Sequence, residues 1–165
     1  MKKLFILLSI SLLTSLVACN KSSDTSNNPT PTSKCQNGGT LVNGICECPF
    51  GYEGDYCDIE SRQKFVGICK GTQSLNGEKA DSHTFEIKKT NGVTKIRISG
   101  GGIEMEAELT DTNKFKIAKQ EYVLGTDVFD IVGNGKLVDN TLSISYSLKA
   151  QKDGLTLTYR FEGKK

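Results

Sequence analysis

The residues of this chain with the most chemistry to offer are its cysteines, because thiols can be acylated, form disulfides or bind zinc. The six are Cys19, Cys35, Cys46, Cys48, Cys57 and Cys69. Four of them crowd into residues 35–57. Zinc sites usually separate paired cysteines by two to four residues, and the single residue between Cys46 and Cys48 does not fit that spacing. We therefore expect no metal site there. Disulfide formation and acylation remain as the chemistry to assign to the six cysteines.

The only histidine offers a second candidate, since His83 directly follows Asp81 and Ser82. A Ser-His-Asp triad needs side chains that converge in space, whereas neighbours on one strand point to opposite faces. We interpret His83 as a surface residue. With no nucleophile–base pair to assemble, we expect no catalytic residues, no cofactor and no enzymatic activity.

Two further patterns could bind ions, but each has a simpler interpretation. The segment Gly133-Asn134-Gly135 is similar to part of a phosphate loop, yet no helix follows to offer its N-terminus. Both glycines share the face of Phe129 and Ile131, where they would let a strand bend or relieve crowding. Three glutamates alternate with apolar residues and are expected on a solvated outer face. They are Glu104, Glu106 and Glu108.

The N-terminus explains the first cysteine. Met1-Lys2-Lys3 precedes an apolar run from Leu4 to Leu13, and Leu16-Val17-Ala18-Cys19 follows. This order is typical of a secretory signal, and the run is too short to span a bilayer. A signal that ends in this way on a cysteine resembles those of bacterial lipoproteins. The resemblance implies removal of residues 1–18 and acylation of Cys19, with palmitate among the acyl chains.

This interpretation predicts a lipid-anchored protein of the cell envelope. Asn20 after the cysteine resembles the sorting pattern for the outer membrane. The sequence does not distinguish the periplasmic face of that membrane from the cell surface. Removal of residues 1–18 leaves 19 basic and 19 acidic residues, and this balance argues against nucleic acid as a partner. Contact with the membrane must then come from the acyl chains. Residues 19–34 are polar and predict a disordered tether, with an export signal or glycan acceptor as the alternative.

Residues 35–57 combine cysteines, glycines and aromatic residues in an order that resembles the C-terminal two-thirds of an EGF-like module. The matching segments are Cys35, Asn37-Gly38-Gly39, Cys46-Glu47-Cys48-Pro49, Gly51-Tyr52, Gly54 and Cys57. Leu41 replaces the third family cysteine and no first cysteine precedes Cys35, and these two pair with each other in the family. The resemblance therefore implies the bridges Cys35–Cys46 and Cys48–Cys57, with Cys69 left as a free thiol.

We expect residues 35–58 to act as a disulfide-stapled spacer, with a receptor contact as the alternative. Calcium-binding modules carry acidic residues before their first cysteine, and residues 30–34 supply none. Asp58 and Glu60 are expected to be a solvated exit from the module. Cys69 is predicted to be a small buried residue, and an intermolecular bridge is the alternative.

Residues 64–165 alternate between apolar and polar positions with a period of two, segment after segment. Ile103–Leu109 is the clearest case, with glutamates on the face opposite the apolar one. Turn signals such as Asn91-Gly92 and Asp153-Gly154 separate the segments. The fold class is therefore mainly β, with about eight antiparallel strands in a barrel or a sandwich.

Two functions from different classes fit this organisation. The first is a non-catalytic module that displays a β-domain to a protein or a glycan. The second is a lipocalin-like carrier of a small apolar ligand, since an eight-stranded barrel has room for side chains or one small ligand. Bulky residues on the expected inward face would fill the barrel and argue against the carrier. These residues are Phe115, Phe129, Tyr146, Tyr159 and Phe161.

Overall fold

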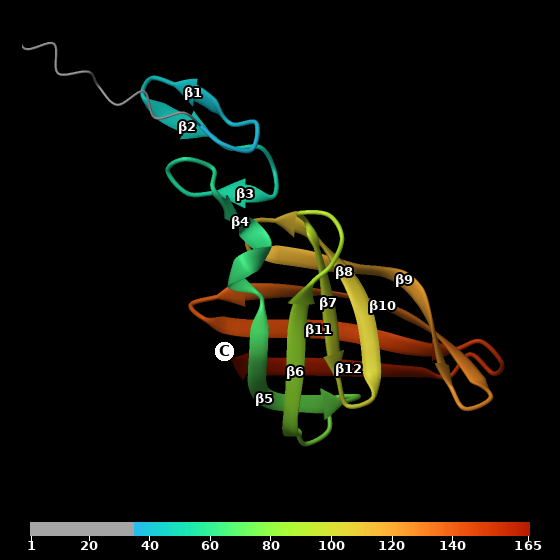
Figure 1. Cartoon of the computed structure of the whole chain (residues 1–165). Coiled ribbons are helices and arrows are strands. Elements are labelled where there is room, and N and C mark those ends of the chain that lie inside the picture. The colour runs from blue at the N-terminus through green and yellow to red at the C-terminus, as the bar shows by residue number, and fades with distance from the viewer. Residues whose placement is uncertain (1–34) are drawn as a thin grey trace, which may run out of the picture. The chain divides into compact units, whose positions relative to one another are not determined.

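A computed structural model describes residues 35–165 of the chain, and the structural statements below concern those residues (Figure 1). The expected signal peptide, the acylated Cys19 and the tether up to residue 34 lie outside the described residues.

Residues 35–60, which we call the cystine module, form two small hairpin-like pairs. In the first, β1 (Thr40–Val42) pairs with β2 (Ile45–Glu47). Asn43 and Gly44 between them both have positive φ, at 50° and 83°, as a tight two-residue hairpin turn requires. The second pair joins β3 (Tyr52–Glu53) to β4 (Ile59–Glu60). A short 3-10 helix, η1 (Ser61–Lys64), then leads into the next strand.

The remaining residues form a closed barrel of eight antiparallel strands, which confirms the predicted fold class and selects the barrel over the sandwich. The strands are β5 (Gly67–Leu75), β6 (Asp81–Lys89), β7 (Lys95–Gly100), β8 (Ile103–Asp111), β9 (Lys114–Leu124), β10 (Asp127–Val138), β11 (Thr141–Ala150) and β12 (Thr156–Lys164). Each strand pairs with its neighbours in sequence, and β12 closes the barrel against β5. Closure leaves no unpaired strand edge for another chain to extend.

Alternation along each strand sends one set of side chains into the barrel. In β8, for example, Met105, Ala107 and Leu109 are buried while the glutamates between them are exposed. Aromatic rings meet edge to face in the interior, with Phe85 and Phe161 at 5.0 Å between centroids and Phe65 and Phe115 at 5.5 Å. Such contacts stabilise a core beyond the area they bury. Side chains, therefore, fill the interior.

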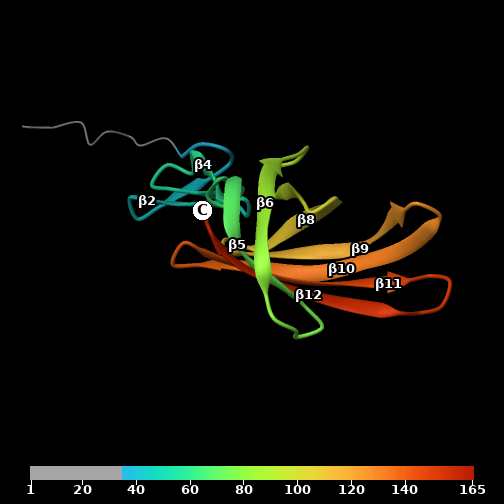
Figure 2. The same cartoon turned by 90° about the horizontal axis from the view of Figure 1, so that it is seen from below.

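The five aromatic residues expected on the inward face all take part in the core. Phe115, Tyr146 and Phe161 are buried, and Phe129 and Tyr159 are partly buried and pack against the same cluster. The rings of Tyr146 and Tyr159 stack at 4.9 Å. Figure 2 shows the long strands β9 to β12 side by side, with their hairpin ends pointing away from β6.

Candidate binding surface

The inward side of β10 carries two glycines at crowded positions beneath the outer surface considered next. A Cβ atom at Gly133 would lie 2.5 Å from the carbonyl oxygen of Ser145, and one at Gly135 would lie 2.2 Å from the ring of Phe115. Neither position can therefore carry a side chain without a shift of its neighbours. The pairing of β9 with β10 also changes register between Ile131 and Gly133, and bulges of this kind bend a strand. The two glycines thus act as predicted, at a crowded bend of an inward-facing strand.

On the outer face of these strands lies a hollow of about 800 Å³, which we call the β9–β12 hollow. Most of its outward side chains are short and polar or positively charged. They are Thr110, Lys114, Lys116, Val132, Asn134, Lys136, Ser143, Ser145, Ser147 and Thr158. Gly133 and Gly135 complete the lining together with the buried residues Phe115 and Tyr146. A volume of this size lies within the range of ordinary ligand sites.

The β9–β12 hollow has three lysines among its lining residues and no aspartate or glutamate. Lys114 and Lys136 are cross-strand partners, and Asn134 stands between Lys116 on β9 and Ser145 on β11. Lys114 has a long ion pair with Asp111 at 3.7 Å. Within residues 35–165, neither Lys116 nor Lys136 has a carboxylate within ion-pair distance. The outward side chains of this depression are therefore mainly polar, and three of them carry positive charge.

A smaller hollow of about 350 Å³ adjoins the first and shares Ser143 and Ser145 with it. Its lining adds one cation, Arg160, and one carboxylate, Glu162. The polar outer surface therefore continues across β11 onto β12, with its positive charge concentrated on β9 and β10.

Arg62 of η1 connects the end of the cystine module to the β6–β7 turn. Its side chain is buried, and its guanidinium donates to the backbone carbonyl oxygens of Thr90 (2.6 Å), Gly92 and Lys95 (2.9 Å). The same group donates to the carboxylate of Glu60 at 3.0 Å. A planar guanidinium with several fixed donors suits such a cluster of acceptors. Arg62 thus holds the turn through three backbone carbonyls and is itself held by Glu60.

Glu60 corrects one expectation, because it is not a solvated exit. Hydrogen bonds from Arg62 and from Lys89, whose ammonium lies 2.7 Å away, lower the pKa of the Glu60 carboxyl to about 2. One partner, Arg62, lies only two residues on, but Lys89 belongs to β6, so the local sequence pattern could not show that the two cations meet at Glu60. Asp58 is exposed, as expected.

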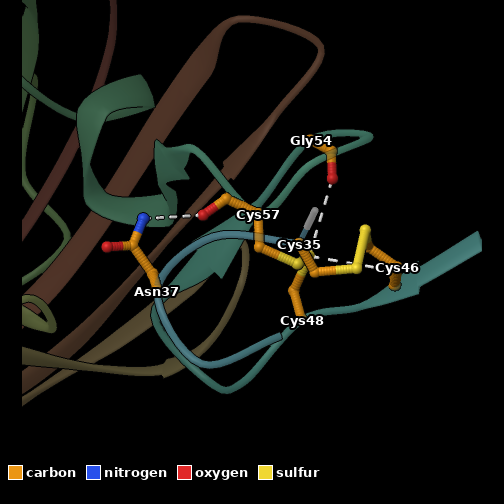
Figure 3. The surroundings of a disulfide bond; sticks show 6 residues. All are labelled: Cys35, Asn37, Cys46, Cys48, Gly54 and Cys57. Carbon is orange, nitrogen blue, oxygen red and sulfur yellow. Dashed lines mark hydrogen bonds between the residues drawn. A yellow bond between two sulfur atoms is a disulfide. The ribbon is translucent and has the colours of Figure 1, made fainter. Parts of the chain in front are cut away.

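The cystine module holds two disulfides, Cys35–Cys46 and Cys48–Cys57 (Figure 3). These are the bridges that the EGF-like resemblance implies. The side chain of Asn37 donates to the carbonyl oxygen of Cys57 at 2.8 Å, which ties the start of the module to its end. A Cβ at Gly39 would lie 2.6 Å from the sulfur of Cys57, so the glycine allows the two bridges to approach.

Cys69 is unbridged and almost fully buried on the inner face of β5. Burial raises the pKa of its thiol, which disfavours the reactive thiolate. The thiol thus lies with the core residues of the barrel, away from the bridged cysteines of the module.

His83 corrects a second expectation, because it points into the barrel and not to the surface. Its ring lies 4.5 Å from that of Phe85 and 6.1 Å from that of Phe161, and its Nε2 atom is buried with no hydrogen-bond partner. Burial lowers the pKa of the imidazole. The sequence pattern indicates this inward position, since His83, Phe85 and Ile87 occupy alternate positions of one strand.

The other candidate ion sites are ordinary surface. Glu104, Glu106 and Glu108 are exposed, and Arg97 on β7 pairs with the first two at 3.5 and 3.3 Å. In the part of the chain that the structure describes, no group of three potential metal ligands comes together. Residues 35–165 also contain no helix long and apolar enough to cross a membrane.

Comparison with known proteins bears on both parts of this structure. Residues 29–57 match the family model of the EGF-like domain. That residues 35–57 contain an EGF-like segment is consistent with this match and with the two disulfides. No curated protein matches the chain.

Three solved structures are similar to the barrel, each over 64% of this chain. One is a crystal structure from Bacteroides fragilis, provisionally described as an outer membrane protein, with 15% identity and a TM-score of 0.44. The match spans 52% of that protein, so this chain corresponds to about half of its length. The others are EF1p2_mFAP2b bound to DFHBI (11% identity, 96% of its length, TM-score 0.43) and the redesigned β-barrel b11L5F_LGL (9%, 96%, 0.39).

Proposed function

We propose that this protein is a lipid-anchored component of the cell envelope that displays its barrel to a partner without catalysing a reaction. The observation that carries the proposal is the position of the β9–β12 hollow. This hollow lies outside the barrel and its outward side chains are mainly polar, while aromatic and aliphatic side chains fill the interior. Such a barrel is suited to binding on its surface.

The membrane part of the proposal rests on the sequence of residues 1–20, with acylation at Cys19. The host organism grown with a labelled fatty acid tests it, comparing wild type with the Cys19→Ala variant. Label should appear on the wild-type protein only, and membrane fractionation should release the variant to the soluble fraction. Label on both proteins would contradict the anchor.

The display part of the proposal is tested with the Cys19→Ala chain lacking residues 1–18, which retains every residue that the structure describes. After fluorescent labelling, this protein should bind to isolated envelopes of the host in a saturable manner, and an excess of unlabelled protein should compete. Binding that never saturates, or that unlabelled protein fails to reduce, would contradict a specific partner in the envelope.

The filled interior also argues against the carrier alternative. Phe65 and Phe85 each expose 1% or less of their surface, which leaves their rings packed against other side chains. Native mass spectrometry of protein purified from its host should find the mass of the polypeptide alone. A stoichiometric additional mass would favour the carrier instead.

A further inference from the structure

We infer that the β9–β12 hollow binds an acidic polysaccharide, which specifies the partner within the proposed display function. The hollow has the size of a ligand site and lies on the outer face of the barrel, across five neighbouring strands from β8 to β12. It is therefore open to a chain that runs across the surface.

Charge favours an anionic occupant. Lys114, Lys116 and Lys136 line the hollow and no aspartate or glutamate does, although the chain as a whole has nearly equal numbers of acidic and basic residues. The nearest carboxylates are at its margin, where Asp111 has a long ion pair with Lys114 and Glu108 is the cross-strand partner of Lys116. Lys136 is the cross-strand partner of Lys114, so two of the lysines stand on adjacent strands about 5 Å apart at the backbone. The three lysines can therefore contact neighbouring acidic units of one polymer.

The remaining lining favours a sugar over a peptide. Ser143, Ser145 and Ser147 present hydroxyl groups along one strand, and hydroxyls and amides both donate and accept, as sugar hydroxyls do. Protein interfaces instead depend on exposed aromatic or apolar anchors, and Val132 is the only apolar side chain that is exposed here. The closed barrel also denies an extended peptide the strand edge it would need.

The test uses the Cys19→Ala chain without residues 1–18, and oligogalacturonate as the probe. Isothermal calorimetry should show saturable binding of the acid form and none of its methyl ester, which keeps the sugar chain but removes the charge. Binding should weaken as sodium chloride is raised, because salt screens exposed charges. No binding of the acid form, or equal binding of the ester, would overturn the inference.

A matched pair of variants locates the site. Lys114→Ala/Lys136→Ala removes two cross-strand lysines of the hollow, and Lys70→Ala/Lys164→Ala removes two cross-strand lysines from the β5–β12 pair. Both change the net charge equally. The first should weaken binding about tenfold, as expected for two charge-assisted contacts, and the second less than about twofold. Equal losses would show attraction to net charge alone and overturn the site.

Two further outcomes separate the inference from the function on which it rests. Polyglutamate of equal charge should bind at least about tenfold more weakly than oligogalacturonate, and equal binding would overturn recognition of a sugar. If the protein binds host envelopes saturably while oligogalacturonate fails, the inference is wrong and the display function stands. If envelope binding also fails, the display function is wrong too.

Discussion

At the scale of single residues, the outer surface of β10 depends on what its inner positions can accommodate. Gly133 and Gly135 let Tyr146 and Phe115 occupy space that any side chain on β10 would take. The two glycines meet a packing requirement inside the barrel, and both also lie among the residues that line the hollow outside it. The outward residues are mainly serines, lysines and an asparagine. Their sequence alone does not predict a concave surface.

Replacing Gly135 with alanine tests the packing requirement inside the barrel. The new methyl group would lie 2.2 Å from the ring of Phe115, and the enforced shift should lower the free energy of unfolding by about 1–3 kcal/mol. Urea unfolding followed by circular dichroism measures this loss. Asn134→Ala, at the exposed position beside it, is the control and should change stability by less than about 0.5 kcal/mol. Equal effects at both positions would contradict the role of the glycine.

His83 predicts a pH dependence of stability. Burial lowers its pKa below the usual value of 6.5 in the folded protein, so below that pH the unfolded chain takes up a proton that the folded barrel resists. The free energy of unfolding should therefore fall as the pH is lowered from 7 to 5. His83→Phe should flatten this slope, because it removes the only histidine. Denaturant titrations at several pH values measure it, and an unchanged slope in the variant would disprove the assignment.

At the scale of elements, η1 shows how four residues can organise a distant turn. One terminal nitrogen of Arg62, Nη1, donates to the carbonyl oxygens of Thr90, Gly92 and Lys95 in the β6–β7 turn. Glu60 holds the guanidinium from the other side. The guanidinium and its acceptors are polar and partly buried. Removal of the guanidinium therefore leaves the acceptors with fewer hydrogen bonds.

Arg62→Ala should therefore lower the free energy of unfolding by about 2–4 kcal/mol, because it removes a buried charged donor and leaves the acceptors without its hydrogen bonds. Arg97→Ala is the matched control, because Arg97 makes only exposed ion pairs with Glu104 and Glu106 and should cost less than about 1 kcal/mol. Thermal unfolding of both variants provides the comparison. A similar loss in both would show that Arg62 acts as an ordinary surface charge.

The sequence predicts the strands better than it predicts what joins them. Period-two alternation identifies the eight strands and their inward faces because burial on one side acts on every second residue. The same rule applied to His83 would have placed it beside Phe85 in the interior, but the polar side chain favoured a surface interpretation. Arg62 could not be found in this way, since its partners are backbone carbonyls that any sequence supplies. The β9–β12 hollow likewise depends on strand pairing, which brings Lys116, Asn134 and Ser145 together from three strands.

At the scale of the whole molecule, covalent and non-covalent stabilisation occupy different parts of the described chain. Both disulfides lie within residues 35–57, where short strands and mostly exposed side chains provide little core. The barrel residues contain one cysteine, Cys69, which is unbridged, and they depend on a continuous apolar interior. Small segments without a sufficient core commonly need such cross-links, whereas a closed barrel of this size does not.

Reduction should therefore affect the two parts differently. With dithiothreitol, the amide protons of residues 35–57 should lose protection against hydrogen exchange, because each bridge contributes about 2–3 kcal/mol through the loop it closes. The amides of β6 to β11 should keep their protection, since no disulfide restrains those strands. Mass spectrometry of peptides after exchange in oxidised and reduced protein measures both. Loss of protection across the barrel on reduction would mean that its stability depends on the module.

The same division predicts the reactivity of the thiols. Non-reducing peptide mapping should recover Cys35 with Cys46 and Cys48 with Cys57. Iodoacetamide should leave Cys69 unmodified until denaturant is added, because it is almost fully buried and burial raises the pKa of its thiol. Cys69→Ser is the control for the site of modification and should remove the labelling seen in denaturant. A peptide joining Cys69 to Cys35 or Cys57 would instead link the barrel covalently to the cystine module. The disulfides would then contribute to the stability of the barrel as well as to that of the module.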